Sequence, residues 1–155
     1  MRKVSFSRLI AGFFLFLLAM GCAGNTAAQS GAAAQPSLYK RLGGYDAIAA
    51  VVDEFLARAA ADKQLSRFLV GLSADSKKRL RQLIVDQFCE ASGGPCFYTG
   101  RPTKAAHTGL GINESDWQIT VNYLVAILDK FKVPEKEKTD FLALASSLKK
   151  DIVEK

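Results

Sequence analysis

The sequence predicts an all-α domain. From residue 36 onward, apolar residues recur at intervals of three and four, which places them on one face of a helix. Capping side chains, glycines and prolines bound the segments that have this spacing. No convincing alternation of apolar and polar residues, the sign of a half-buried strand, accompanies them. Together these observations predict four main helices.

The first helix is expected over residues 45–61. Its apolar residues lie three or four positions apart, so one side of the helix can be buried against the rest of the domain. The residues on that side are Ile48, Val51, Val52, Phe55, Leu56 and Ala59.

The second helix is expected to begin at about Asp75 or Ser76 and to end at Ala91. Ser73 and the two starting candidates can each supply an N-cap oxygen, and the Gly-Gly-Pro run at 93–95 stops the helix. Its inner face would be formed by Leu80, Ile84, Gln87, Phe88 and Ala91. The glutamine is the one irregularity on this apolar face.

Two further helices are expected in the last third of the chain. Asn113 can cap the third, whose first turn holds Glu114 and Asp116, where acidic side chains are favourable. Its buried side would be Trp117, Val121, Leu124, Ile127, Leu128 and Phe131. Pro134 suits the first turn of the fourth helix, which would bury Phe141, Leu142, Leu144, Ala145, Leu148 and Ile152.

A long connection separates the second helix from the third. Residues 93–111 are nineteen residues with five glycines and two prolines. A loop of this length in a small helical domain is usually functional or wrapped around something. It contains His107, the only histidine of the chain, on what can be only a short helical turn from Thr103 to Thr108.

Residues 1–21 have the pattern of an export signal. Three basic residues precede about a dozen uncharged ones, too few to span a membrane. The segment ends in Leu-Leu-Ala-Met-Gly-Cys and resembles a bacterial lipobox, which predicts acylation of Cys22 and a lipid anchor in the cell envelope. Ala23 in place of aspartate favours the outer membrane, facing the periplasm. The alternative is a plain secretory signal cut near Ala23 or residues 27–28.

Composition divides the rest of the chain into two parts. Residues 22–35 lack aromatic side chains and are expected to form a flexible tether, whereas residues 36–155 can bury a single core. Removing the signal lowers the formal charge from +6 to +3, so the basic balance is a weak argument for nucleic acid, and no such partner is expected. Cys89 and Cys96 can form a disulfide in an exported chain; two free buried thiols are the alternative.

A single histidine restricts the metal sites that this chain can build. Zinc and di-iron sites need several histidine, cysteine or carboxylate ligands, and no such set is evident. Heme needs only one protein ligand, because the porphyrin brings four nitrogens of its own. His107 is therefore compatible with heme, although spacing alone favours a histidine without a chemical role.

Three stretches together resemble the first group of the truncated hemoglobins. They are LYKRLGGYDAIAAVVDEFLARAAADKQLSRFL at 38–69, GGPCFYTGRPTKAAHTGLGI at 93–112 and DWQITVNYLVAILDKFKVP at 116–134. The match runs from residue 37 to about residue 153. The resemblance implies a truncated globin fold, a two-over-two helical sandwich around heme b, with His107 as the proximal ligand of the iron.

The resemblance also implies which residues face the bound gas. Alignment back from the Gly-Gly-Pro run places Leu80 and Ile84 over the iron and Gln87 one turn further, as the expected hydrogen-bond donor. Gln82 would replace it only if the helix were rotated. Many first-group members carry a tyrosine after a phenylalanine in the first helix, but here Leu56 follows the phenylalanine. Loss of that donor predicts faster oxygen dissociation than in tyrosine-bearing relatives.

Other heme contacts are implied by the same alignment. Phe68, or one place later Leu69, matches the phenylalanine that wedges the heme. Phe88 and Ile112 would pack against the heme, and Tyr98 would face the heme or a propionate. Lys104 and Arg101 are candidate propionate partners, with Arg101 better explained as a solvated charge.

The sequence thus predicts a heme protein that reversibly binds oxygen or another diatomic gas such as NO or CO. Oxygen storage or transport is one use. Nitric oxide detoxification, an enzymatic dioxygenase activity that needs a reductase, is another. A helical lipoprotein acting as a binding or scaffold module without heme is the alternative. A thiol enzyme would need Cys89 or Cys96 within hydrogen-bond reach of His107.

Overall fold

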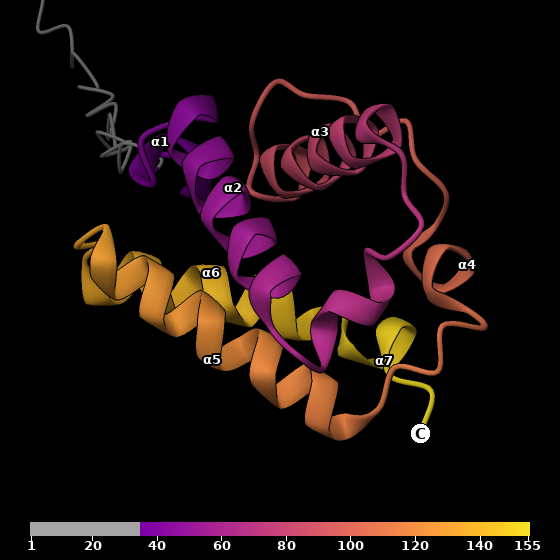
Figure 1. The fold of residues 1–155 in the computed structure, drawn as a ribbon. Coiled ribbons are helices and arrows are strands. Elements are labelled where there is room, and N and C mark those ends of the chain that lie inside the picture. Colours follow the sequence, from indigo (N-terminus) through magenta and orange to yellow (C-terminus); the bar gives the residue numbers. More distant parts are fainter. Residues whose placement is uncertain (1–34) are drawn as a thin grey trace, which may run out of the picture. The chain divides into compact units, whose positions relative to one another are not determined.

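The computed structural model describes residues 35–155, and every regular element within them is helical (Figure 1). The elements are α1 (Leu38–Arg41), α2 (Tyr45–Ala61), the 3₁₀ turn η1 (Leu65–Phe68), α3 (Ala74–Ala91), α4 (Thr103–His107), α5 (Glu114–Lys130), α6 (Glu135–Ser147) and α7 (Lys149–Ile152). The all-α prediction is confirmed. The predicted signal peptide, Cys22 and all but the last residue of the tether lie outside the described residues. Among the described helices, none is long and apolar enough to cross a membrane.

The main helices form two layers, with α2 and α3 in one and α5 and α6 in the other (Figure 1). The contact between α2 and α3 buries Ile48, Ala49, Val52, Val85 and Cys89. The contact between the layers buries Val51, Leu124, Ile127, Leu128, Phe141 and Ala145. Each large apolar side chain removed from water in this way contributes about 1.5–3 kcal/mol to folding. Because α2 belongs to both clusters, it carries the packing that joins the layers.

The ends of the main helices follow from local chemistry. Gly44, the N-cap of α2, has a φ of 84°, a conformation that side chains with a Cβ rarely adopt. Ser73 caps α3 by accepting the N–H of Ser76, so the helix begins at Ala74, slightly earlier than expected. Asn113 and Asp116 form the full reciprocal capping box of α5.

Three expectations from the helical periodicity are wrong. Ala91 is exposed, because α3 buries Val85 and Cys89 against α2 instead, both with no exposed area. Phe131 is 42% exposed, because it lies just past the end of α5 as its C-cap. The fourth helix begins at Pro134 as expected, with the proline as its N-cap, but it is interrupted at Leu148 to give α6 and α7 in place of one helix.

A disulfide joins the end of α3 to the loop that follows it. Cys89 and Cys96 are bonded, with their Cα atoms 5.8 Å apart. The turn between them needs glycine, since a Cβ at Gly94 would lie 2.5 Å from Cδ2 of Tyr39. The disulfide is therefore formed, and both thiols that a thiol enzyme would need are consumed, which removes that alternative.

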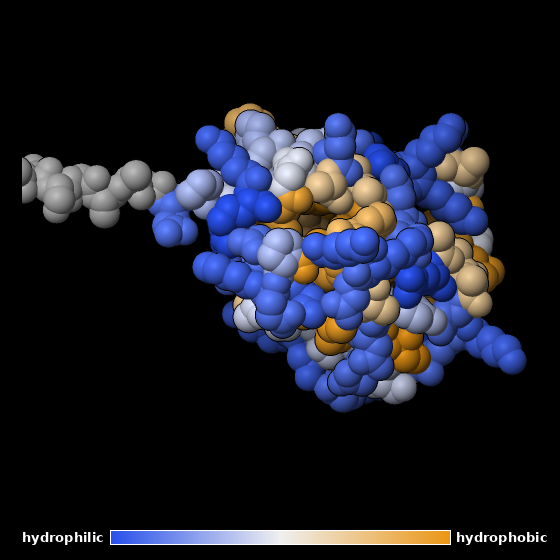
Figure 2. All heavy atoms as spheres, turned by 90° about the vertical axis from the view of Figure 1, so that its left-hand side faces the viewer, coloured by the Kyte–Doolittle hydropathy of each residue, from blue (hydrophilic) through white to orange (hydrophobic). Residues whose placement is uncertain are grey.

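One face of the domain carries an apolar hollow. Figure 2 shows hydrophobic side chains gathered around a depression on an otherwise hydrophilic face. On this side, a cavity of about 240 Å³ lies between the start of α2, the end of α5 and α6. Its lining residues are Leu42, Ala47, Ile48, Ala50, Val51, Leu128, Phe131, Val133 and Phe141.

Candidate functional site

A much larger cavity, of about 670 Å³, lies between the two layers. Side chains from α2, η1, α3, α4, α5, α6 and α7 line it, together with the loop before α4. Eight of the nine predicted site residues are among them: His107, Phe68, Leu80, Ile84, Gln87, Phe88, Tyr98 and Ile112. The ninth, Lys104, is exposed and lies outside the lining. The structure thus brings the predicted residues to one cavity, and their contacts with heme stay predictions.

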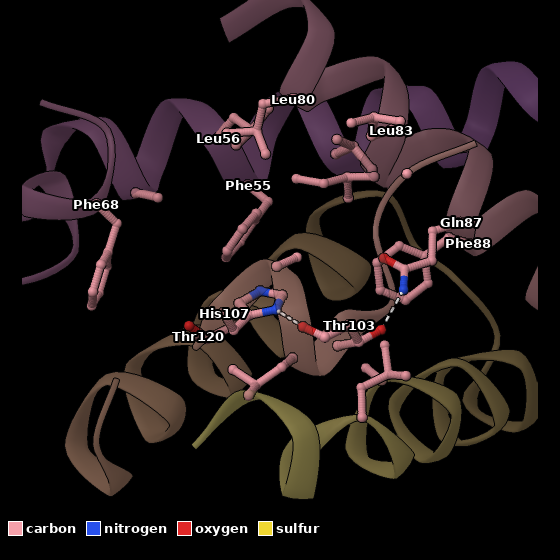
Figure 3. A pocket seen from close by; sticks show the side chains of 18 of the residues that line it. Phe55, Leu56, Phe68, Leu80, Leu83, Gln87, Phe88, Thr103, His107 and Thr120 are labelled. Atoms are coloured by element: carbon pink, nitrogen blue, oxygen red, sulfur yellow. Dashed lines mark hydrogen bonds between the residues drawn. The ribbon is translucent and has the colours of Figure 1, made fainter. Parts of the chain in front are cut away.

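His107 presents one defined nitrogen to this cavity. Its Nδ1 lies 2.7 Å from the carbonyl oxygen of Thr103, four residues earlier in α4 (Figure 3). A carbonyl oxygen can only accept a hydrogen bond, so Nδ1 carries the proton. In the neutral imidazole with this tautomer, the lone pair lies on Nε2, which is then the nitrogen able to bind a metal.

The wall across from His107 is apolar. It includes Phe55, Leu56, Leu80, Leu83 and Ile84. In Figure 3 the side chains of Leu56 and Leu80 lie across the cavity from the imidazole, with that of Phe55 between them and the ring. No hydrogen-bond donor is among these five side chains.

The two glutamines of α3 are both hydrogen-bonded. Gln82 is exposed, donates to Tyr45 Oη and Asp86, and does not line the cavity. The helix is therefore not rotated into the alternative register. Gln87 lines the cavity, but its Nε2 donates to Oγ1 of Thr103 over 2.9 Å, instead of standing free across from His107.

The segment after His107 is held by the C-terminal part of the chain. The carboxylate of Glu154 accepts the backbone N–H groups of Gly109 and Gly111, at 2.5 and 3.0 Å. Its own backbone N–H donates to the carbonyl of Ile112 over 2.8 Å. Both glycines have positive φ, 87° and 65°, so their N–H groups can point toward one carboxylate.

Phe68 is placed by a tightly bonded turn. Asp62 follows α2, and its carboxylate accepts the N–H groups of Gln64 and Leu65 and the hydroxyl of Tyr123, at 2.7–2.8 Å. These hydrogen bonds, with that of Leu65 largest, hold the pKa of Asp62 below its ordinary value. They fix η1, and with it Phe68, at one end of the cavity (Figure 3).

The donor set suits heme better than a cage of protein ligands. Within residues 35–155 no group of three histidine, cysteine or acidic side chains is placed to hold a metal ion. What the cavity offers is one imidazole nitrogen facing an apolar slot. A metal bound there would need to bring its remaining ligands with it, as a porphyrin does.

Comparison with known proteins identifies the family. A model described as bacterial-like globin matches residues 37–154. The chain is 36% identical over 116 residues to the group 1 truncated hemoglobin GlbN of Mycolicibacterium paratuberculosis, a match that covers 75% of this chain and 83% of that protein. It belongs to the group 1 truncated hemoglobins.

Three other proteins are also similar to this chain. GlbN of Synechocystis is 30% identical over 115 residues, covering 72% of this chain and 90% of the relative. The truncated hemoglobin of Tetrahymena pyriformis, in its Fe(III) form, superposes with a TM-score of 0.69 at 23% identity over 77% of this chain and all of that one. The 2/2 hemoglobin of Synechococcus, solved with covalently attached heme, also gives 0.69, at 25% identity, covering 76% and 98%. The predicted two-over-two sandwich is confirmed.

A buried carboxylate supports the floor of this truncated hemoglobin's cavity. Asp116 is only 1% exposed and lines the cavity near the start of α5. It accepts the backbone N–H of Asn113 at 2.9 Å, the amide of Gln64 at 2.7 Å and the guanidinium of Arg67 at 2.6 Å. Burial alone would raise its pKa, but these hydrogen bonds hold the pKa of Asp116 below its ordinary value. The charge therefore ties η1 to α5.

Asp116→Asn should lower the free energy of unfolding by about 2 kcal/mol at pH 7, because hydrogen bonds to a charged group contribute about 1.5–3 kcal/mol each. The folded-state pKa of Asp116 is depressed, so its contribution is complete above the unfolded-state value of about 3.9 and is lost as the pH falls through the folded-state value. Urea unfolding at pH 7 and pH 3 measures this. The stability gap between the two proteins should shrink at pH 3; a gap independent of pH would show that the charge is not responsible.

Several residues that line the cavity were not identified from the sequence. Thr103, Leu83 and Arg79 all line the cavity, and none was singled out in advance. Thr103 could have been found, because the carbonyl four residues before a helical histidine is within reach of its ring. Leu83 and Arg79 gave no comparable signal, since apolar and basic residues are both common on a surface helix.

Proposed function

We propose that this protein holds heme b through Nε2 of His107 and reversibly binds a diatomic gas on the opposite side. The observation that carries the proposal is the hydrogen bond from His107 Nδ1 to the Thr103 carbonyl, which makes Nε2 the metal-binding nitrogen of the neutral ring at an apolar slot. Membership in the truncated hemoglobins supports it. Heme, when bound, supplies the iron that takes up the gas; the chain supplies the ligand and excludes water.

Heme b is the form that the residues favour. Covalent attachment through thioethers needs a Cys-x-x-Cys-His motif, and the sequence has none. Phe68 and Phe88 flank the cavity with apolar rings, and Ile112 is buried beside it. Arg79 and Arg101 line the cavity and are exposed, so they can meet carboxylates at its mouth.

A scaffold module without heme is not favoured. The cavity of about 670 Å³ is lined mainly by apolar side chains and contains an imidazole, and a bound apolar ring would remove this lining from water. A scaffold module gives no reason for such a lining.

The test is heme uptake by the purified chain. Titration with hemin should give a Soret band that saturates at one heme per chain, and the reduced protein should bind oxygen and CO with distinct spectra. Pyridine treatment should release heme b into solution. A chain that remains colourless after titration, with far-ultraviolet circular dichroism showing intact helices, would overturn the proposal.

We also propose that the mature protein is exported and anchored by acyl chains on Cys22, in the outer membrane facing the periplasm. The support is the lipobox-like end of the apolar segment and the alanine after the cysteine. Several acyl chains would give firm attachment, at about 0.8 kcal/mol per buried methylene. The full chain should fractionate with membranes and incorporate labelled palmitate, whereas Cys22→Ser should incorporate none. Equal labelling of the two chains would contradict the anchor.

The physiological use of gas binding depends on whether a reductase is present. Storage or delivery of oxygen needs only the binding reaction, whereas nitric oxide dioxygenase activity also needs a reductase that returns the iron to the ferrous state. Nitrate formation from NO under oxygen, with and without an added electron donor, distinguishes the two. Turnover that continues only with the donor supports the enzymatic use.

A further inference from the structure

Two hydrogen bonds meet on one residue beside the imidazole. Thr103 accepts the Nδ1 proton of His107 at its carbonyl oxygen, over 2.7 Å, and accepts the amide of Gln87 at its hydroxyl oxygen, over 2.9 Å. Gln87 belongs to α3, in the other layer of the fold. We propose that Gln87 is a positioning residue for the iron ligand, acting through Thr103 to fix the direction and donor strength of His107. This inference rests on the proposed function.

The short helix α4 needs such support from outside. It has only five residues, and a helix of that length does not hold its shape without tertiary contacts. Its N-cap is Pro102, which makes no side-chain cap hydrogen bond. Glu154 holds the chain after His107 through Gly109 and Gly111, and its side chain makes no hydrogen bond to the first turn of α4. Among the side-chain hydrogen bonds of the described chain, the one from Gln87 is the one that reaches Thr103 from another element.

A displacement of Thr103 would change the position of the His107 ring. The hydrogen bond to the Thr103 carbonyl fixes the rotation of the imidazole ring about its Cβ–Cγ bond. The same hydrogen bond makes the ring a stronger electron donor to a metal. If the carbonyl moves away, the ring is free to turn and Nε2 becomes a weaker ligand. Loss of the Gln87 hydrogen bond should therefore alter the iron–histidine bond, although Gln87 does not touch the imidazole.

This role differs from the one expected from the sequence, in which Gln87 donates to the bound gas. In Figure 3 the Gln87–Thr103 hydrogen bond lies to one side of His107, whereas Leu56 and Leu80 lie across the cavity from the ring. The two roles make opposite predictions for Thr103. A donor to the gas does not need the threonine hydroxyl, whereas a positioning residue cannot act without it.

The experiment removes each partner of the hydrogen bond in the heme-loaded protein. Gln87→Leu removes the amide, Thr103→Val removes the hydroxyl at nearly constant shape, and Thr103→Ser keeps the hydroxyl as the matched control. Each of the first two should raise the rate of heme loss from the ferric protein about fivefold, equivalent to about 1 kcal/mol, the contribution of one hydrogen bond. Both should also lower the iron–histidine stretching frequency in the resonance Raman spectrum of the reduced protein. Thr103→Ser should leave both quantities unchanged.

The double variant decides whether the two residues act through one contact. Gln87→Leu combined with Thr103→Val should lose heme no faster than either single variant, because the second change removes nothing further. Effects that multiply would overturn the proposal. The proposal would also be overturned if Thr103→Val left the Raman frequency unchanged while Gln87→Leu changed nothing except the rate of oxygen dissociation.

Failure of this inference can be told apart from failure of the proposed function. If heme binding survives loss of the imidazole at 107, the proposed function is wrong. If heme binding depends on that imidazole but Gln87→Leu and Thr103→Val leave heme loss and the Raman frequency unchanged, only the positioning role is wrong. Circular dichroism of the heme-free variants shows that each of them still folds.

Discussion

His107→Gly should abolish stable heme binding and with it all gas binding. His107 is the only histidine of the chain, and with Nδ1 bonded to the Thr103 carbonyl its Nε2 is the nitrogen available to a metal. Loss of a residue that only orients a metal ligand costs roughly 10–100-fold in affinity, so loss of the ligand itself should exceed about a hundredfold. Hemin titration followed at the Soret band measures the affinity.

Heme binding by the His107→Gly variant should be restored by added imidazole. Free imidazole can enter the space left by the side chain and supply the missing nitrogen, so millimolar imidazole should restore the spectrum of the reduced protein. Thr108→Ser is a suitable control, because it changes the exposed residue next to His107 but keeps the hydroxyl that donates to the Lys104 carbonyl. Unchanged heme affinity in His107→Gly would remove the basis of the proposed function.

Leu56→Tyr should slow oxygen dissociation by about 10- to 100-fold. Leu56 lines the cavity on the wall across from His107, which has no hydrogen-bond donor among its five apolar side chains. A ligand that gains negative charge on binding is held longer by a donor, and such a hydrogen bond contributes about 1.5–3 kcal/mol. Stopped-flow measurement of oxygen release from the reduced protein gives the rate directly.

Leu56→Phe separates the hydroxyl from the ring. It adds nearly the same bulk to the same wall but no donor, so its oxygen dissociation rate should stay close to that of the unsubstituted protein. If the phenylalanine variant slows release as much as the tyrosine variant, crowding and not hydrogen bonding controls the rate. The two variants should differ far less in their carbon monoxide dissociation rates than in their oxygen dissociation rates, because bound carbon monoxide gains less charge.

Local sequence signals predicted the helices well. The capping side chains of Ser73 and Asn113 and the glycines at 44 and 93 act within a few residues, so their effects can be derived without the fold. The buried faces were predicted less well, and Ala91 shows why. Periodicity gives one apolar stripe, but α3 has two neighbours: it packs Val85 and Cys89 against α2 and turns Leu80 and Ile84 to the cavity.

The residues that line the site could be predicted from the sequence, but the hydrogen bonds between them could not. His107, Phe68 and Phe88 could be placed at the cavity from the resemblance of short motifs. The partner of Gln87 could not, because Thr103 lies on another element, and no spacing rule relates an α3 amide to a hydroxyl sixteen residues later. The burial of Asp116 was likewise hidden, since an acid in the first turn of a helix is ordinarily a solvated cap.

The contact of Glu154 with Gly109 and Gly111 has a consequence for when the cofactor can be captured. A polypeptide leaves the ribosome, and crosses a membrane, with its earlier residues first. His107 therefore emerges well before the carboxylate that closes the loop behind it, and until then this loop lacks its anchor. We therefore expect stable heme uptake to follow the synthesis of residue 154 and, under the proposed export, to occur on the far side of the membrane, where heme must be delivered.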